Sequence, residues 1–300
     1  MASARGMTVN DDNRQERPLH RSFVLHGFIL AMLVIYAAPI IGVLITSVMS
    51  NAEISARGVW HVPEAATLGN FVDVWNDTPT PRYLLNSFMV TIPATALSVL
   101  GGVLLGYVFS HFRFPFAELL FLVVIAGMVF PPQGMLIPLF RMFNSPVEIM
   151  GFQILPALYD TVYPMILIHM SIGLAITTLL LRNFMSALPS GLREAAIVDG
   201  AGEWSVLFRI IVPLSLPALA VLATLQFTWI WNDFLWPLVL TRSEEAKTIM
   251  AGISALQGQY TVAWANQAAM AVIASIPTVD IFIAFQRYFN AGLTMGSDKE

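Results

Sequence analysis

The residues whose types and spacing best suit a specific interaction lie between two apolar runs, in the segment 184–212. Ser190 follows Pro189 and is expected to cap a short helix, and Gly200 is expected to end that helix in a left-handed turn. A second helix is expected to begin at Glu203. The segment therefore predicts a helix-turn-helix elbow.

One face of the first elbow helix is suited to contact with another protein. At helical spacing this face carries Leu192, Ala195, Ala196 and Asp199. The two alanines let another protein come close, and the carboxylate can accept hydrogen bonds from it. The chemistry expected of the elbow is therefore docking, not catalysis.

A second set of candidates lies inside the apolar runs, where polar groups are costly. A carboxylate such as Asp233 or Asp280 costs about 2.5–3.5 kcal/mol at the centre of a spanning helix, so it usually marks a cavity or a partner. His169 would either line a path or form a hydrogen bond between helices. Aromatic and amide groups suit sugar rings and hydroxyls, although ordinary packing explains them equally well. The candidates for a translocation path are Gln226, Trp229, Asn232 and Asp233.

No spacing of residues indicates catalysis or a metal site. The chain has no cysteine, and its five histidines form no pattern such as H-E-x-x-H. Neither Lys247 nor Lys299 lies in a P-loop pattern, so the chain cannot be its own ATPase. The net charge of −4 is too small and too dispersed to indicate a nucleic-acid partner.

The composition indicates an integral membrane protein. Charged residues make up 11% of the chain and hydrophobic residues 57%, whereas soluble domains have about 25% charged residues. The first apolar run, 22–52, contains no Lys, Arg, Asp or Glu and is longer than the apolar core of a cleaved signal peptide, about 7–15 residues. We therefore interpret it as a spanning helix, with lipid around it.

The apolar runs predict an all-α membrane protein with six transmembrane helices. A cytoplasmic tail, 1–21, precedes the transmembrane domain, 22–290, and a second tail, 291–300, follows it. The coupling elbow, 184–212, lies between the fourth and fifth spans. The predicted spans are about 22–49, 83–109, 117–138, 161–181, 213–240 and 266–290.

The basic residues predict the orientation of these spans. With the amino end in the cytoplasm, ten of the fifteen Lys and Arg residues lie on the inner side and five on the outer side. Both chain ends and the elbow are then cytoplasmic. The polar segment 241–265 is then on the outer side.

Several motifs resemble those of one transporter family. The residues EAAIVDGA at 194–201, with Arg209, Ile210 and Pro213, are similar to the EAA coupling motif of ABC importer permease subunits, with Val212 in the place of a leucine. The remaining motifs resemble the maltose-type carbohydrate branch of that family: LGNFVDVW at 68–75, LRNF at 181–184, WNDFLWPLVL at 231–240 and QRYFNAGLT at 286–294.

This resemblance implies a permease in the bacterial inner membrane that forms half of a translocation path. The implied partners are two ATP-binding subunits, a second related permease and an extracytoplasmic solute-binding protein that delivers a sugar-like molecule. ATP and Mg²⁺ would be bound by the partner subunits and not by this chain. The elbow residues implied to contact the ATPase are Arg193, Glu194, Ala195, Ala196, Asp199, Gly200 and Ala201.

The alternative from the residues alone is a secondary, ion-coupled transporter. In such a carrier Asp233, Asp280 and His169 would relay charge across the membrane. Secondary carriers usually have more spans and internal repeats than this sequence shows. The importer is therefore the main hypothesis.

Overall fold

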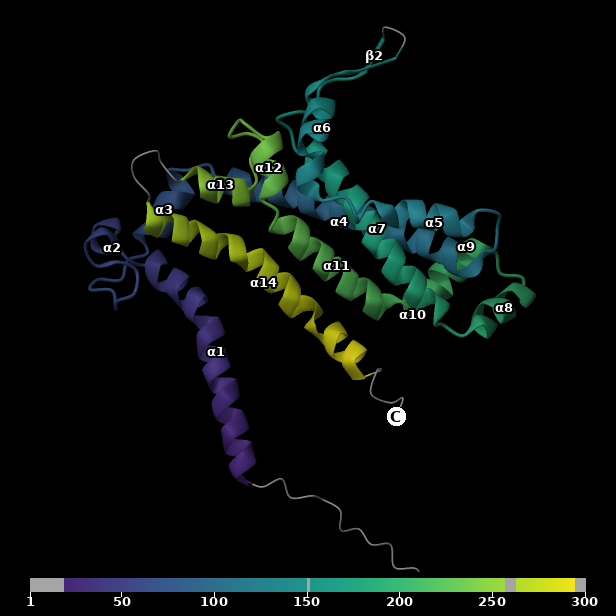
Figure 1. The fold of residues 1–300 in the computed structure, drawn as a ribbon, viewed down its shortest axis with the longest axis horizontal. Coiled ribbons are helices and arrows are strands. Elements are labelled where there is room, and N and C mark those ends of the chain that lie inside the picture. Colours follow the sequence, from purple (N-terminus) through teal and green to yellow (C-terminus); the bar gives the residue numbers. More distant parts are fainter. Residues whose placement is uncertain (1–18, 150–151, 257–262, 295–300) are drawn as a thin grey trace, which may run out of the picture.

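The computed structural model describes residues 19–149, 152–256 and 263–294, and these residues are almost entirely helical (Figure 1). The first half contains α1 (Leu19–Ser47), α2 (Asn51–Arg57), α3 (Gly69–Asn76), α4 (Thr80–His111), α5 (Ala117–Ala126), α6 (Pro132–Asn144), β1 (Val147–Ile149) and β2 (Phe152–Leu155). The second half contains α7 (Tyr163–Ser186), α8 (Ser190–Val198), α9 (Glu203–Val206), the π-helix η1 (Leu207–Ile211), α10 (Val212–Leu214), α11 (Leu216–Trp231), α12 (Leu235–Leu240), α13 (Ile249–Ala255) and α14 (Trp264–Thr294).

Four of the described helices are long and apolar enough to cross a membrane by themselves: α1, α4, α7 and α14. The segment Glu203–Leu214 and the helix α11 form a fifth span if they are counted as one unit. The chain bends by 76° between them. These helices match four predicted spans and most of a fifth. The count of six spans stays a prediction.

The third predicted span, 117–138, is not one continuous helix. It consists of α5, which has 10 residues, and α6, which begins at Pro132. Pro131 and Pro132 interrupt the helix because proline supplies no backbone N–H for the preceding turn. The break places Gly127, Met128 and Phe130 in an irregular, exposed stretch between α5 and α6.

The fifth predicted span, 213–240, is also broken. It contains α11 and the short helix α12, separated at Asn232 to Phe234. The all-helical prediction also missed an antiparallel pair, β1 and β2, in which Val147 is paired with Leu155 and Ile149 with Phe152. This hairpin projects from one end of the molecule beyond α6 (Figure 1).

The helices α4 and α7 form the most extensive pair in the bundle, because glycines on α4 let the backbones approach. A Cβ atom on Gly106 would lie 2.9 Å from Leu181 Cβ, and one on Gly102 would collide with Thr177. Thr177 Oγ1 also donates a 2.8 Å hydrogen bond to the Ser98 carbonyl of α4. The G-x-x-x-G spacing in α4 is therefore a packing surface.

Elsewhere the helices present apolar side chains outward, as a lipid-facing surface requires. Along α1 nearly every large apolar residue is exposed, and Tyr36 has 78% of its surface free. The buried residues instead form clusters along the axis of the bundle. Trp231 of α11 is 1% exposed, and its indole N–H donates a 2.9 Å hydrogen bond to the Ala274 carbonyl of α14, which ties these two helices together.

The two ends of the bundle carry different elements (Figure 1). At one end lie α2, α3, α12 and α13. At the opposite end lie α8 to α10, the first turn of α1 and the last turn of α14. The elbow, the start of α1 and the end of α14 thus lie toward the same end of the bundle.

Candidate functional site

A cavity of about 280 Å³ lies between the break in the third predicted span, α7, α11 and α12. Its walls are mainly apolar and aromatic, with three polar side chains. The residues that line it are Gly127, Met128, Phe130, Pro132, His169, Ile172, Gly173, Ile176, Gln226, Trp229, Ile230, Asp233, Leu235 and Trp236. We call it the central cavity.

Asp233 lies at the interruption after α11 and starts the helix α12. Its carboxylate accepts hydrogen bonds from the backbone N–H groups of Leu235 and Trp236, at 3.2 and 3.3 Å. These N–H groups belong to the first turn of α12 and have no helical partner, so the carboxylate caps them. The local role of Asp233 is therefore to begin a helix at the wall of the cavity.

His169 of α7 connects this cap to the neighbouring helix. Its Nε2 atom lies 3.2 Å from Asp233 Oδ2, and its side chain is buried. The histidine thus makes the expected hydrogen bond between helices and also lines the cavity. Sequence reasoning singled out both residues but could not pair them, because they are far apart along the chain.

Two further predicted path residues line the same cavity. The buried Gln226 donates a 3.3 Å hydrogen bond from Nε2 to the Gly173 carbonyl of α7, which leaves its amide oxygen available. Trp229 is 67% exposed and borders the cavity. Asn232 does not line it: its Nδ2 atom donates a 2.8 Å hydrogen bond to the Thr228 carbonyl.

Asp280 lies apart from this group. It borders a separate, mainly apolar groove of about 580 Å³ between α4, α11 and α14. Arg287 does not approach it within the described part of the chain, since Arg287 contacts Tyr288 instead. The three residues that an ion-coupled relay would use are therefore not in one place.

The elbow begins at α8, and its first helix ends as predicted. Gly200 has φ +87°, a left-handed conformation, and its N–H donates to the Ile197 carbonyl while the Ala201 N–H donates to the Ala196 carbonyl. These two bonds form a Schellman motif. The start of the helix differs from the prediction, because Pro189 occupies the cap position and Ser190 is the first helical residue without a side-chain capping bond.

The predicted docking residues of the elbow divide between its two faces. Glu194, Ala195 and Asp199 are exposed. Ala196 and Ala201 instead pack against the chain's own core, on a cluster that includes Met185 and Val206. Ala196 is half-buried on this cluster, and contact of both alanines with a partner stays a prediction.

Arg193 also has a partner within the chain. Its guanidinium forms an ion pair with Glu203, the first residue of α9, and lies over the Phe112 ring at 5.3 Å. Glu203 accepts a second hydrogen bond from the Tyr107 hydroxyl of α4. Arg193 therefore joins the two elbow helices and α4, and its contact with the ATPase stays a prediction.

The outer surface of the elbow is apolar. Val198 is 86% exposed and Trp204 68%, and the Trp204 ring is stacked on Phe208 with ring centres 5.9 Å apart. Leu192 is also exposed. Large apolar side chains in water are unfavourable, so this face is a candidate contact surface.

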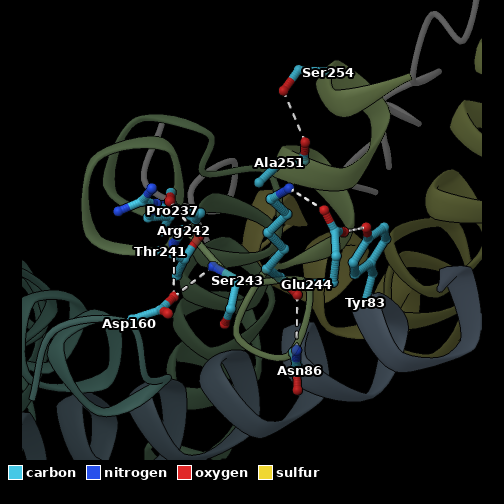
Figure 2. Close-up of polar contacts among 11 residues, drawn as sticks. Tyr83, Asn86, Asp160, Pro237, Thr241, Arg242, Ser243, Glu244, Ala251 and Ser254 are labelled. Atoms are coloured by element: carbon cyan, nitrogen blue, oxygen red, sulfur yellow. Dashed lines mark hydrogen bonds and ion pairs between the residues drawn. The ribbon is translucent and has the colours of Figure 1, made fainter. Parts of the chain in front are cut away.

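At the opposite end, residues 241–249 are fixed by polar contacts that we call the loop clamp (Figure 2). Asp160, at φ +61°, accepts hydrogen bonds from the N–H groups of Arg242 and Ser243 at 2.7 and 2.9 Å. Asn86 of α4 donates to the carbonyls of Glu245 and Lys247, and Ser87 accepts from the Ile249 N–H. Burial raises the pKa of the Asp160 carboxyl, but the hydrogen bonds from Arg242 and Ser243 outweigh it, so the pKa lies below its ordinary value.

Glu244 completes the loop clamp. Its carboxylate contacts both the Tyr83 hydroxyl of α4 and the Lys247 ammonium (Figure 2). The segment that follows the loop clamp contains α13. Gln257 and Gln259, in the polar segment 241–265 that is predicted to lie on the outer side, are outside the described residues.

The chain matches one protein family, over residues 98–295: "Binding-protein-dependent transport system inner membrane component". Among curated relatives, it is 34% identical to the osmoprotective compounds uptake permease protein GgtD of Synechocystis, over 97% of this chain and 96% of that protein. It is 30% identical to the sulfoquinovosyl glycerol transport system permease protein SmoH of Agrobacterium fabrum, over 87% and 88%. A bacterial ABC transporter that imports the acidic polysaccharide alginate has a similar fold, with a TM-score of 0.74 and 23% identity over 91% of this chain and 98% of that one.

Proposed function

The chain belongs to the inner membrane components of binding-protein-dependent transport systems, and we propose that it lines half of the path by which a sugar or sugar-derived substrate crosses the membrane. It is a multi-pass membrane permease subunit of an ABC importer, not an enzyme. Transport in this family depends on a binding protein. The ion-coupled alternative is not favoured.

The central cavity is the observation that carries the proposal of a sugar substrate. An exposed indole, a carboxylate and a buried amide border one space between α7, α11 and α12. A sugar ring presents C–H groups that pack on an aromatic face and hydroxyls that bond to carboxylate and amide groups. Relatives that transport a sulfoquinovosyl glycerol and alginate agree with this substrate class.

The elbow supports the proposal that ATP binding in separate subunits drives the conformational change. Its exposed apolar side chains Leu192, Val198 and Trp204 would lie in a groove of an ATP-binding subunit, with Glu194 and Asp199 beside them. The internally paired Arg193 and the turn at Gly200 would transmit the movement to α4 and α11. ATP and Mg²⁺ would be held by two such partner subunits.

The second proposed contact is with the binding protein, at the opposite end of the bundle. The loop clamp fixes residues 241–249 against α4, and the polar segment that continues to residue 265 would reach the binding protein from there. A second, related permease would complete the path.

Substitution of Trp229 tests the path in the intact importer. Trp229→Ala removes the exposed aromatic wall without breaking a hydrogen bond of the described structure. Since an aromatic contact contributes about 0.5–1.5 kcal/mol beyond its area, we expect uptake at low substrate concentration to fall about threefold to tenfold. The measurement is uptake into proteoliposomes of the sugar that copurifies with the complex, identified by mass spectrometry.

Trp264→Ala is the matched control, because Trp264 is half exposed at the start of α14 and does not line the cavity. Equal uptake by the Trp229 and Trp264 variants and the unmodified protein would show that the cavity is not the path. Copurification of an amino acid or a metal complex in place of a sugar would contradict the substrate class.

A further inference from the structure

A second cavity, of about 730 Å³, lies beside the elbow, at the turn between α4 and α5. Arg113 from the turn, Arg182 from α7 and Arg193 from α8 border it, together with Ser110, Ser186 and Ser190. Glu118 and Glu194 also border it. Three guanidinium groups thus converge on one space against two carboxylates. We call it the basic cavity.

Aromatic rings hold two of these guanidinium groups in place. Arg182 lies over the Phe121 ring at 3.9 Å and is paired with Glu118, and Arg193 lies over Phe112 and is paired with Glu203. Each side chain is only 22% exposed. Stacking on a ring fixes the plane of a guanidinium. Its remaining N–H donors lie in that plane, so their directions are fixed as well.

Donors remain available after these pairs are formed. Arg182 uses only Nη2 on Glu118, and Arg193 uses Nε and Nη2 on Glu203. Arg113 is exposed and has no ion-pair partner among the described residues. The first turn of α8, at Ser190, also reaches the cavity without a side-chain cap, which adds positive potential. The cavity therefore offers several donors to an anion with more than one oxygen.

The surroundings of the cavity are those of a membrane surface. The turn carries Phe112, Phe114 and Phe116, of which Phe116 is 75% exposed. Aromatic side chains are enriched at the level of lipid headgroups. A stripe on α5 leads away from the cavity at helical spacing, formed by Leu119, Leu122 and Val123, which are 57%, 55% and 64% exposed. Leu119 belongs to the cavity wall as well as to this stripe.

We propose that the basic cavity binds the phosphate of an anionic phospholipid, with the acyl chains on the exposed stripe of α5. Basic pockets between transmembrane helices are suited to such headgroups. The apolar stripe favours a lipid over free phosphate, because it lies beside the cavity and can pack against acyl chains, which free phosphate does not have. The headgroup would bridge the turn after α4 to α8, so the lipid would set the position of the elbow.

A photoactivatable phosphatidylglycerol tests this proposal in the intact complex. We expect the lipid to label this chain in the peptides that contain the turn and α5, and a phosphatidylcholine probe to label them much less. Each basic side chain near a membrane surface contributes about a fivefold change in affinity. Arg113→Gln and Arg182→Gln are therefore each expected to weaken labelling about fivefold in a competition titration.

Two further variants make the result specific. Arg141→Gln removes an exposed arginine of α6, outside the basic cavity, and is expected to change nothing. Glu118→Gln frees Arg182 from its carboxylate and is expected to strengthen labelling. Arg113 is exposed in a turn, so its replacement leaves folding intact and keeps the test valid even if the Arg182 variant is unstable.

Three outcomes would overturn the proposal. They are equal labelling by the choline lipid, full labelling of the Arg113 variant, and displacement by millimolar inorganic phosphate, which would make the site one for a soluble anion. If neither the anionic lipid nor inorganic phosphate bound, an acidic protein segment would be the better occupant of the basic cavity. The test does not use transport, so an error in the proposed substrate class would leave its result unchanged.

Discussion

The loop clamp and the elbow lie at opposite ends of the bundle and differ in how their side chains are covered. In the loop clamp the polar groups of residues 241–249 find partners within the chain, from Asp160, Asn86 and Ser87. In the elbow the exposed face of α8 and α9 carries large apolar side chains, among them Val198 and Trp204, that no part of the described chain covers. The first region is held mainly by contacts within the chain, whereas the second carries the exposed apolar surface proposed to contact an ATP-binding subunit.

The backbone follows the same division. The elbow contains the turn at Gly200 and the π-helix at 207–211, and the 76° bend before α11 follows directly after it. Such interruptions are frequent at functional sites and hinges. In the loop clamp the one unusual conformation, at Asp160, is held by its own hydrogen bonds. The proposed coupling surface and the loop clamp therefore differ in both side chains and backbone.

The largest expected effect comes from Gly200→Val in the elbow. The left-handed conformation costs a residue with a side chain about 1–2 kcal/mol, and more if it is β-branched. We expect the chain to insert normally, because no span depends on this residue, but uptake per ATP hydrolysed to fall at least tenfold. The measurements are recovery of the solubilised complex and coupled uptake in proteoliposomes.

Gly202→Val is the matched control for this prediction. A Cβ atom meets nothing within 4 Å at either glycine, but Gly202 has φ −74°, which any residue adopts. A comparable loss of coupling in both variants would mean that added bulk, not the turn, is responsible. Full coupling in the Gly200 variant would remove the elbow from the mechanism.

An intermediate effect is expected from Asp160→Ala in the loop clamp. The change removes the acceptor for two backbone N–H groups and places alanine in a left-handed conformation. Hydrogen bonds to a charged group contribute about 1.5–3 kcal/mol, with the lower value suited to this half-buried carboxylate. We expect the binding-protein concentration for half-maximal ATPase stimulation to rise about tenfold, with the maximal rate unchanged.

Asp160→Asn keeps an acceptor and tolerates the left-handed conformation, so it should behave nearly like the unmodified protein. A loss equal to that of alanine would show that the charge, not the geometry, fixes the loop. No change in either variant would separate the loop clamp from binding-protein contact.

The lowered pKa of Asp160 sets the pH range of this contribution. A carboxyl group whose pKa is lower in the folded state stabilises that state above its unfolded pKa, about 3.9. The contribution is lost as the pH falls through the lower, folded value. Thermal unfolding between pH 5 and 8 should therefore show the same difference between the unmodified protein and the Asp160→Ala variant, and the difference should shrink only below about pH 4.

Sequence reasoning identified the features that depend on local chemistry. Gly200 takes a positive φ, which glycine adopts without steric cost because it has no Cβ atom. The long apolar runs of α4, α7 and α14 form helices because backbone N–H and C=O groups in lipid must be hydrogen-bonded within the segment. Three of the four predicted path residues also share one cavity, since the fifth span brings Gln226, Trp229 and Asp233 to its wall. Helical spacing grouped Gln226 and Trp229 with Asn232, which does not line the cavity, whereas Asp233 was singled out as a costly carboxylate.

The features that were missed depend on tertiary contacts. Nothing near Arg193 in the sequence shows that its guanidinium would pair with Glu203, and nothing near Ala196 shows that it would pack on the chain's own core. The break in the third predicted span could have been placed from Pro131 and Pro132. What lies beside the break could not, because His169 and Asp233 come from other helices.

The smallest expected effect comes from the ion pair between the two elbow helices. Arg193 and Glu203 are 22% and 38% exposed, and ion pairs that reach solvent contribute about 0.2–1 kcal/mol. We expect Arg193→Gln and Glu203→Gln each to lower coupled uptake about twofold to threefold while the complex assembles normally. If both residues act through their shared ion pair, the double variant should lose no more uptake than the more affected single variant. This double-mutant cycle is measured in proteoliposomes. The cycle also tests the division between the two ends of the molecule: if the two losses multiply, Arg193 and Glu203 act separately on a partner, and the elbow has less internal structure than the pairing indicates. Replacement of Lys247, a basic residue of the loop clamp, by glutamine should leave coupling unchanged and serves as the control at the opposite end.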